Sequence, residues 1–363
     1  NTIESLTVEQ AQKLAREFPG VDVVLWKGKN GTGIRPKTLP LNMLKALDEH
    51  TARALAEYSK GDLYLNGLTT LDADTAKALA GFKVNMLELN GLTTLDAKTA
   101  ESLARNFGDG LCLDGLKSID LSTAEALAEH RTHSLSLNGL TTLDAETAKA
   151  LAEFKGKVLH LDGLITLDEE PAKALARFKG DSLHLDGLTT VDADTTKALA
   201  EFKGSKLGLS GLTTLDAGTA STLAEFKGHS LYLNGLTTPE TYTAKVLGEF
   251  KGNWLGLDGL TTLDADTAKA LAEFKGQNLS LSGLTTLDAE TATVLVKAAV
   301  LTFRLERLTT LDAGAAKALA EVAKWDGDLS GFTAFESPDS VEIAQALATR
   351  KGPLKLPNLK KIS

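Results

Sequence analysis

Several features that stabilise or localise proteins are scarce in this sequence. Its 363 residues contain one cysteine, Cys112, which excludes a disulfide within the chain. No stretch approaches the roughly 20 apolar residues of a transmembrane helix, so we expect no membrane span. Acidic side chains outnumber basic ones by 48 to 39, and the formal net charge of −9 disfavours nucleic acid as a partner.

The familiar catalytic motifs are missing too. The sequence holds no P-loop, no GxSxG, no HExxH and no CxxC motif. Carboxylates are abundant, but most of them fall where helices are expected to begin and so read as helix caps. We therefore expect a protein that is not an enzyme and carries no cofactor. The compartment stays open, because a disulfide-free repeat protein can work inside or outside a cell.

One pattern dominates what is present: an apolar-x-apolar triplet returns every 24 residues. The triplet begins at residues 39, 63, 87, 111, 135, 159, 183, 207, 231, 255, 279 and 303, and a degraded copy follows at 327. A fixed period of about 20 to 50 residues is typical of a solenoid, in which each repeat packs only on its neighbours. Chain length alone would suggest two or more globular domains, but the repeat predicts a single solenoid instead.

The repeat at 135–158, LSLNGLTTLDAETAKALAEFKGKV, shows which elements to expect. Leu135 and Leu137 alternate with polar residues, which indicates a very short strand with one buried face. Gly139 ends this strand, and we expect it to adopt a backbone geometry that a Cβ atom would forbid.

The second half of the same repeat predicts a helix. Asp144 is a good N-cap, because its carboxylate can accept hydrogen bonds from the free N–H groups of the first turn. The helix should run over about 145–154, with Leu151 in its apolar stripe. Gly156 should close it as the left-handed residue beyond the C-terminus.

A strand followed by a helix in every repeat makes successive strands parallel, with the helices on the other side of the sheet. Helices are about 10 Å wide whereas neighbouring strands lie about 4.8 Å apart, so the stack should curve with the sheet on its concave face. The predicted fold class is an α/β solenoid in the form of a curved horseshoe.

The strand Leu-x-Leu and the AKALAEF-type helix, as at 135–137 and 148–154, resemble a bacterial-type variant of the leucine-rich repeat superfamily. The resemblance covers about 39–350 and implies a binding scaffold. The superfamily usually reads LxxLxLxxNxL, with a buried Asn after the strand. Here the unit reads LxLxGLTTLDAxTAKALAEFKG, and a polar residue before the glycine either takes a shifted version of that ladder role or faces solvent. Examples are Asn66, Asn90, Asp114, Asn138 and Asp162.

The ends of the chain depart from the pattern. We interpret 1–38 as an N-terminal cap that covers an apolar end, with a helix over 6–18. Thr7 and Gln10 have the spacing of a capping box at its start. The regular array occupies 39–326, and a degraded repeat with a C-terminal cap occupies 327–363, all within one continuous solenoid.

The repeats differ most where the strands face away from the leucines. The residue between the two strand leucines varies from Tyr64 to Arg304, whereas exposed helix positions such as Lys149 and Glu153 vary less. A constant scaffold with a varied concave surface favours recognition of a protein or peptide over neutral drift. The predicted contact residues are Tyr64, Glu88, His160, His184, Lys206, Tyr232, Trp254 and Arg304.

Two constellations suggest other functions. Tyr232 and Trp254 fall in neighbouring repeats and form either a patch for a glycan or peptide, as in a carbohydrate-binding or adhesion module, or isolated surface aromatics. His160 and His184 should lie about 5 Å apart on stacked strands. With Asp162 and Asp186 they are a weak candidate metal site; the alternative is two exposed histidines duplicated with their repeat.

Overall fold

The computed structural model describes residues 4–28, 31–58, 61–82, 85–103, 108–297, 304–322, 325, 327–335 and 338–362. For residues 22–28, 31–37, 335 and 361–362 it describes the backbone alone. The chain divides into two compact units, 1–185 and 186–363, which are described separately.

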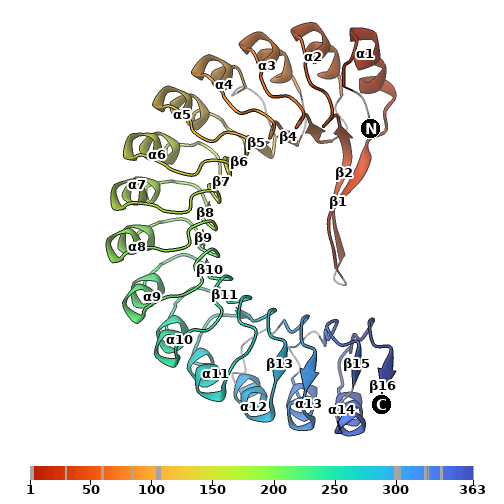
Figure 1. Cartoon of the computed structure of the whole chain (residues 1–363), viewed down its shortest axis with the longest axis vertical. Coiled ribbons are helices and arrows are strands. Elements are labelled where there is room, and N and C mark those ends of the chain that lie inside the picture. Colours follow the sequence, from red (N-terminus) through yellow and green to blue (C-terminus); the bar gives the residue numbers. More distant parts are fainter. Residues whose placement is uncertain are drawn as a thin grey trace. The chain divides into compact units, whose positions relative to one another are not determined.

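The first unit alternates strands and helices in every repeat (Figure 1). Its strands are β1 (Val21–Gly28), β2 (Gly31–Pro40), β3 (Leu63–Tyr64), β4 (Met86–Glu88), β5 (Gly110–Cys112), β6 (Ser134–Ser136), β7 (Val158–His160) and β8 (Ser182–His184). Its helices are α1 (Val8–Glu17), α2 (Glu49–Leu55), α3 (Ala73–Leu79), α4 (Ala97–Leu103), α5 (Leu121–Ala128), α6 (Ala145–Ala152) and α7 (Glu169–Leu175).

The second unit keeps this alternation as far as β12, which β13 follows directly; β13 and β14 form one separate two-stranded sheet, and β15 and β16 form another. Its strands are β9 (Lys206–Gly208), β10 (Ser230–Tyr232), β11 (Trp254–Gly256), β12 (Asn278–Ser280), β13 (Thr286–Leu287), β14 (Thr310–Leu311), β15 (Ala334–Phe335) and β16 (Lys361–Ile362). Its helices are α8 (Ala193–Ala200), α9 (Ala217–Ala224), α10 (Thr241–Gly248), α11 (Ala265–Leu271), α12 (Ala289–Lys297), α13 (Ala313–Ala320) and α14 (Ser340–Ala348).

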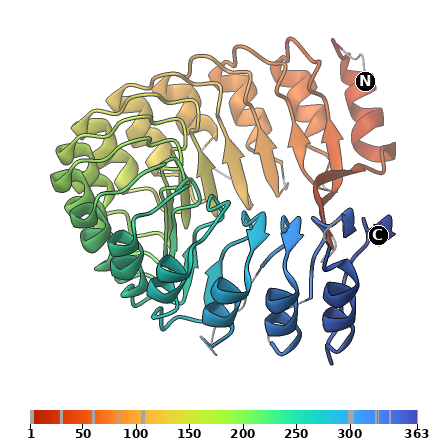
Figure 2. The ribbon, with the colours of Figure 1, turned by 60° about the horizontal axis from the view of Figure 1, so that its bottom comes forward.

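Apart from the antiparallel pair β1 and β2, the strands pair parallel, and those of the repeats are in register with the 24-residue period. Leu135 pairs with Leu159 in the first unit, and Leu231 pairs with Leu255 in the second. Within each unit the strands line the inner side of the curve and the helices the outer side (Figures 1 and 2). Each unit is therefore an α/β repeat solenoid, as the sequence predicts.

The core lies between the strands and the helices. The strand residue Leu135 and the helix residue Leu151 are both fully buried. A phenylalanine follows most helices in the sequence, and these rings stack from one repeat to the next. The ring centroids of Phe226 and Phe250, for example, are 6.3 Å apart, and the two rings are nearly parallel. Each repeat thus completes the apolar core of its neighbours, which explains why the motif tolerates so little variation.

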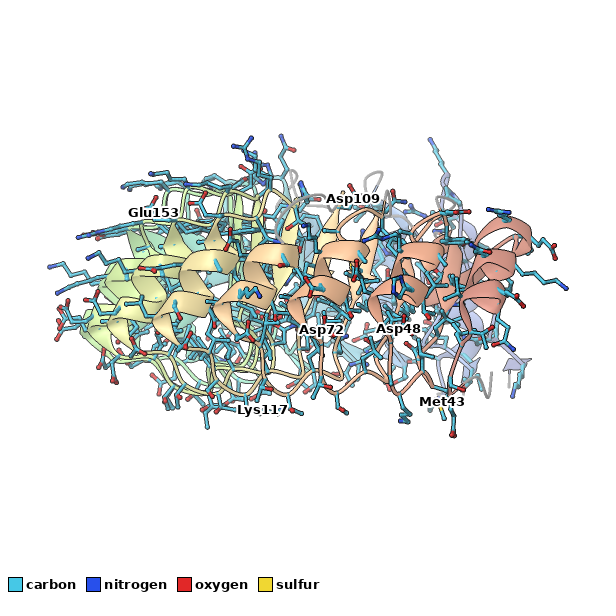
Figure 3. The ribbon with its side chains drawn as sticks, turned by 90° about the horizontal axis from the view of Figure 1, so that it is seen from above. Met43, Asp48, Asp72, Asp109, Lys117 and Glu153 are labelled. Carbon is cyan, nitrogen blue, oxygen red and sulfur yellow. The ribbon has the colours of Figure 1, made fainter. Side chains whose placement is uncertain are left out.

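The aspartates before the helices act as N-caps. Asp144 accepts hydrogen bonds from the backbone N–H of Thr147 at 2.9 Å and from its hydroxyl at 2.8 Å. These bonds lower the pKa of the Asp144 carboxyl. Asp48 and Asp72 cap α2 and α3 in the same way, and Figure 3 shows them beside those helices, with charged side chains projecting from the outer side.

The structure corrects the prediction for Gly156 and supplies the physical reason for the glycine at 139. Gly156 does not have a positive φ, because α6 already ends at Ala152 with Glu153 as its C-cap. Gly139 does not have one either. A Cβ atom on Gly139 would lie 2.2 Å from the carbonyl oxygen of Asp114, in the preceding repeat. The glycine is required by this close approach of two backbones, not by an unusual φ.

The N-terminal segment begins as predicted. Thr7 and Gln10 form a capping box at the start of α1. The strand β1 then turns back to pair antiparallel with β2, which in turn pairs parallel with β3. Among the described residues, no helix combines the length and apolar character that crossing a membrane would take.

Candidate functional site

The polar residue before each glycine joins neighbouring repeats. In the first unit, Asn90 Oδ1 accepts the backbone N–H of Asp114 at 2.9 Å, and Asp114 does the same for Asn138 at 2.9 Å. In the second unit, Asp258 accepts the N–H of Ser282 at 2.9 Å. Of the two roles that the sequence leaves open, these residues take the ladder role. This ladder of hydrogen bonds between repeats holds the backbone at the end of each strand. It therefore also holds the position of the outward side chains just before that end.

The outward positions of β3 and β4 differ in accessibility. Tyr64 is only 6% exposed, so it offers little surface to a partner. Glu88 is half-buried and accepts a hydrogen bond from Asn66 Nδ2 at 2.9 Å. Of these two predicted contact residues, Glu88 alone is available at this end of the strand face.

The two predicted histidines come together on the first unit. His160 and His184 are partners in the register of β7 and β8. Their rings stack with centroids 4.5 Å apart, close to the predicted separation. His160 Nδ1 also lies 3.8 Å from the carboxylate of Asp162. Asp186 is the first residue of the second unit, where its side chain accepts the N–H of Ser210 at 2.7 Å.

An aromatic and cationic cluster occupies the strand face of the second unit. Tyr232 and Trp254 are half-buried, with ring centroids 6.4 Å apart. The Arg304 guanidinium lies over the Trp254 ring, 5.9 Å from its centroid, and its side chain is 49% exposed. Lys206, on β9, is exposed in the same row of the sheet as Trp254. We call Tyr232, Trp254 and Arg304 the aromatic cluster.

Glycines make room for this cluster. Tyr232 pairs in register with Gly208 on one side and Gly256 on the other. A Cβ atom on Gly256 would lie 3.2 Å from Tyr232 Cδ1, so the ring lies against the backbone that the glycine leaves bare. The Trp254 indole Nε1 is buried and has no hydrogen-bond partner among the described residues. Contact with the bare backbone of Gly256 and burial of the indole Nε1 thus hold the Tyr232 and Trp254 side chains against the sheet.

A cavity of about 650 Å³ lies on the strand face of the first unit. Its lining includes Met86, Glu88, Cys112, Ser136, Val158 and His160. Cys112 Sγ lies 3.3 Å from Met86 Sδ, and both side chains belong to the outward positions that vary between repeats. The sequence predicts which strand positions face outward, but it does not predict this cavity. The cavity depends on how side chains from several strands, including the small Ser136, lie beside one another.

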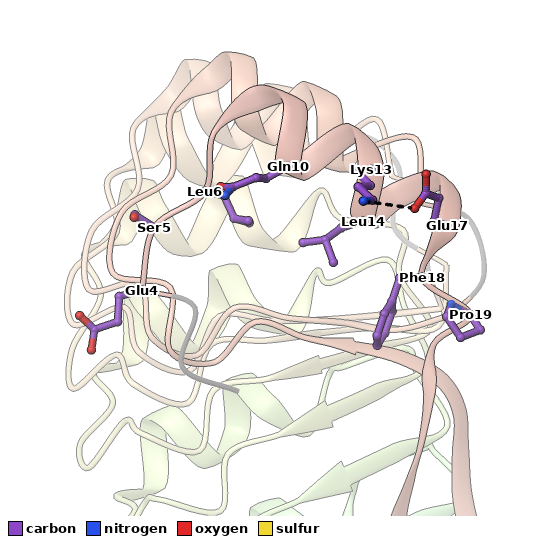
Figure 4. Close-up of a pocket in the computed structure, with 9 residues that line it drawn as sticks. All are labelled: Glu4, Ser5, Leu6, Gln10, Lys13, Leu14, Glu17, Phe18 and Pro19. Carbon is purple, nitrogen blue, oxygen red and sulfur yellow. Dashed lines mark ion pairs between the residues drawn. The ribbon is translucent and has the colours of Figure 1, made fainter.

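A second cavity, of about 680 Å³, lies beside α1 (Figure 4). Leu6, Leu14 and Phe18 give it an apolar wall, and Lys13 and Glu17 form an exposed ion pair at 3.9 Å along its edge. None of the predicted contact residues lines it. We assign it to the end of the repeat stack rather than to a recognition site.

The repeated strand and helix, the buried leucines and the polar ladder together decide the architecture. The chain has a leucine-rich-repeat-like fold. No family model matches the sequence, and no curated protein matches it.

Two solved structures resemble this leucine-rich-repeat-like chain. An internalin (InlF) from Listeria monocytogenes is 14% identical, with a TM-score of 0.47, covering 78% of this chain and 77% of its own. The TLR13–ssRNA13 complex is 18% identical, with a TM-score of 0.47, covering 82% of this chain but only 43% of its own. Likeness at this level assigns no ligand to the chain.

Proposed function

We propose that this chain is a non-enzymatic scaffold that recognises a protein or peptide through the strand face of its repeats. The observation that carries the proposal is the aromatic cluster on the second unit. Tryptophan, tyrosine and arginine are the residues that most often dominate the binding energy of protein interfaces. Here three of them gather on a face whose neighbouring positions are mostly glycine, serine and asparagine.

The scaffold supports such a role. The leucines and the ladder residues hold the backbone in register, so an outward side chain can change without disturbing the core. The outward positions of β9 to β12 lie on a parallel sheet of fixed spacing. A partner would therefore meet a rigid surface, which lowers the entropic cost of binding.

The charges of the cluster favour a partner with an acidic group beside an apolar one. Lys206 is exposed, and Arg304 lies 4.0 Å from Glu306 across a partly exposed contact. An acidic side chain could therefore pair with Lys206 or Arg304 while its neighbours pack on Trp254. This combination is common in peptides and favours a protein or peptide partner.

A carbohydrate is the second candidate ligand, because a half-buried Trp and Tyr can stack on sugar rings. One contact weighs against it. The Arg304 guanidinium lies over the Trp254 ring and competes with a sugar for its face. A glycan array probed with the wild-type chain and with Trp254→Ala separates this candidate from the first.

The test of the proposal is a selection of peptides on the wild-type chain from a displayed random library. The selected peptides are then measured against a double variant, Trp254→Ala with Tyr232→Ala. We expect the variant to keep its circular dichroism spectrum and to lose binding by about 2 kcal/mol or more, or roughly 30-fold.

The matched control lies on the outer side of the same unit. Lys269→Ala with Glu273→Ala removes two exposed side chains of the repeat that begins at Trp254. We expect this variant to bind the peptides as the wild type does. Peptides that tolerate loss of the aromatic pair but not of the outer pair would reverse the assignment of the working face.

A further inference from the structure

A cluster of potential metal ligands lies on the first unit, away from the aromatic cluster that carries the proposed function. We propose that His160, Asp162 and His184 bind a divalent transition-metal ion, with Zn²⁺ as the ion to test first. The two imidazoles come from neighbouring parallel strands, β7 and β8, at paired positions of the register. Side chains at such positions leave the same face of a sheet.

Asp162 has a carboxylate oxygen close to a ring nitrogen of each histidine, and the two histidine rings are in contact. The two rings stack with centroids 4.5 Å apart and planes 23° apart. His160 Nδ1 lies 3.8 Å from the nearer Asp162 carboxylate oxygen. A donor atom of Asp162 and one of His184 lie within 4.8 Å of each other. The carboxylate of Asp162 is thus near both imidazoles, and the nitrogens of the two stacked rings would have to turn toward it to hold one ion.

These separations are near those of a bound site. Donors that surround Zn²⁺ tetrahedrally at 2.0 to 2.2 Å are about 3.3 Å from one another. The side chains would need to close by about 0.5 to 1.5 Å, which rotation about their side-chain bonds can supply. His160 and Asp162 are each 29% exposed at the side chain, so they retain the freedom to turn.

The donor set decides the class of metal. Imidazole nitrogens with a carboxylate oxygen suit Zn²⁺, Co²⁺, Ni²⁺ and Cu²⁺, whereas Mg²⁺ and Ca²⁺ prefer oxygen ligands alone. A thiolate would favour Cu⁺, but the single cysteine is on β5, two strands away from β7. Three protein ligands leave one position of a tetrahedral ion open, and His160 also lines the 650 Å³ cavity through which a further ligand can approach.

The surroundings suit a cation. On β6 to β8, the other outward side chains before and between the leucines are Ser134, Ser136, Val158 and Ser182, which are small and neutral. Asp162 is held in place by Asn138, whose Oδ1 accepts its backbone N–H at 2.8 Å. Support of this kind is common behind metal ligands, because it orients them before the ion arrives.

The experiment is titration of the untagged full chain with Zn²⁺ by isothermal calorimetry at pH 7.5, with the metal content checked after dialysis. We expect one ion per chain. His160→Ala and His184→Ala should each weaken binding by about 10-fold or more. Asp162→Asn should also weaken it, although the amide keeps an acceptor oxygen for the ladder.

The matched control is His50→Ala, which removes an exposed histidine of α2 in the same unit. We expect it to bind Zn²⁺ as the wild type does. Circular dichroism of each variant shows whether it is folded.

A second readout does not depend on the variants. Addition of Co²⁺ to the wild-type chain should broaden the imidazole NMR signals of His160 and His184 and leave those of His50, on α2, sharp. The proposal is overturned if the wild type binds no Zn²⁺ at 1 mM, or if all the histidine variants bind it equally. In either case the two histidines are only a stacked pair beside an acid, and the proposed function of the second unit is untouched.

Discussion

His130 provides a sharp test of the repeat packing. It occupies the position of the buried phenylalanine in its repeat, equivalent to Phe154 one period later, and it is 0% exposed. Its Nε2 lies 3.1 Å from the carbonyl oxygen of Ala100, and its Nδ1 is buried without a hydrogen-bond partner among the described residues. Burial lowers the pKa of His130 to about 4, because a charged imidazole would lose its hydration.

The magnitude follows from proton linkage. An unfolded histidine has a pKa of about 6.5, so between pH 6.5 and 4 the unfolded chain binds a proton that folded His130 does not. Neutral His130 therefore destabilises the folded chain relative to the unfolded chain only below about pH 6.5. The free energy of unfolding falls progressively as the pH is lowered from there toward 4. The loss from this group is about 2 kcal/mol at pH 5 and approaches about 3 kcal/mol near pH 4.

The assay is urea denaturation of the wild type and of His130→Phe at pH 7.5 and at pH 5. Phe restores the side chain of the other repeats and has no proton to bind, so the variant should lose about 2 kcal/mol less stability than the wild type over this range. His133→Phe, at an exposed position three residues later, should leave the pH dependence unchanged. Equal pH dependence of His130→Phe and the wild type would refute the burial of a neutral imidazole.

Four further predictions concern the scaffold. Leu151→Ala should cost about 2 to 5 kcal/mol in denaturant melts, because its side chain is fully buried, whereas Glu153→Ala on the outer side should change stability by less than about 0.5 kcal/mol. Asp144→Ala should cost about 1 kcal/mol at pH 7 and less below pH 4, since the lowered pKa of this carboxyl means that its contribution is lost as the pH falls through the folded value. Gly139→Ala should lower the melting temperature, because its Cβ would lie 2.2 Å from a backbone oxygen of the preceding repeat; an unchanged value would exclude the close approach. Deletion of 1–38, the proposed cap, should cause aggregation in light scattering, and a truncated chain that stays monomeric would count against a capping role.

The outward face of the strands was partly predictable. The alternation of each strand places Tyr232, Trp254 and Lys206 on the side opposite to the leucines, and the structure has them there. The contact of Arg304 with Trp254 was not predictable, because it joins residues two repeats apart through a long side chain. The burial of Tyr64 was also not predictable from its place in the pattern, which it shares with the half-buried Glu88.

Sequence alone determined the elements of each repeat and their order. The 24-residue period, the paired leucines and the Asp cap act within a single repeat, over distances that a few residues of chain can span. Only the tertiary structure decided what depends on contact between repeats. A glycine is required after each strand because the backbone of the preceding repeat comes too close for a Cβ atom. The polar residue before that glycine accepts a hydrogen bond from the backbone of the next repeat. The neutral state of His130 has the same origin, since desolvation by packed neighbours, and not the local sequence, sets its pKa.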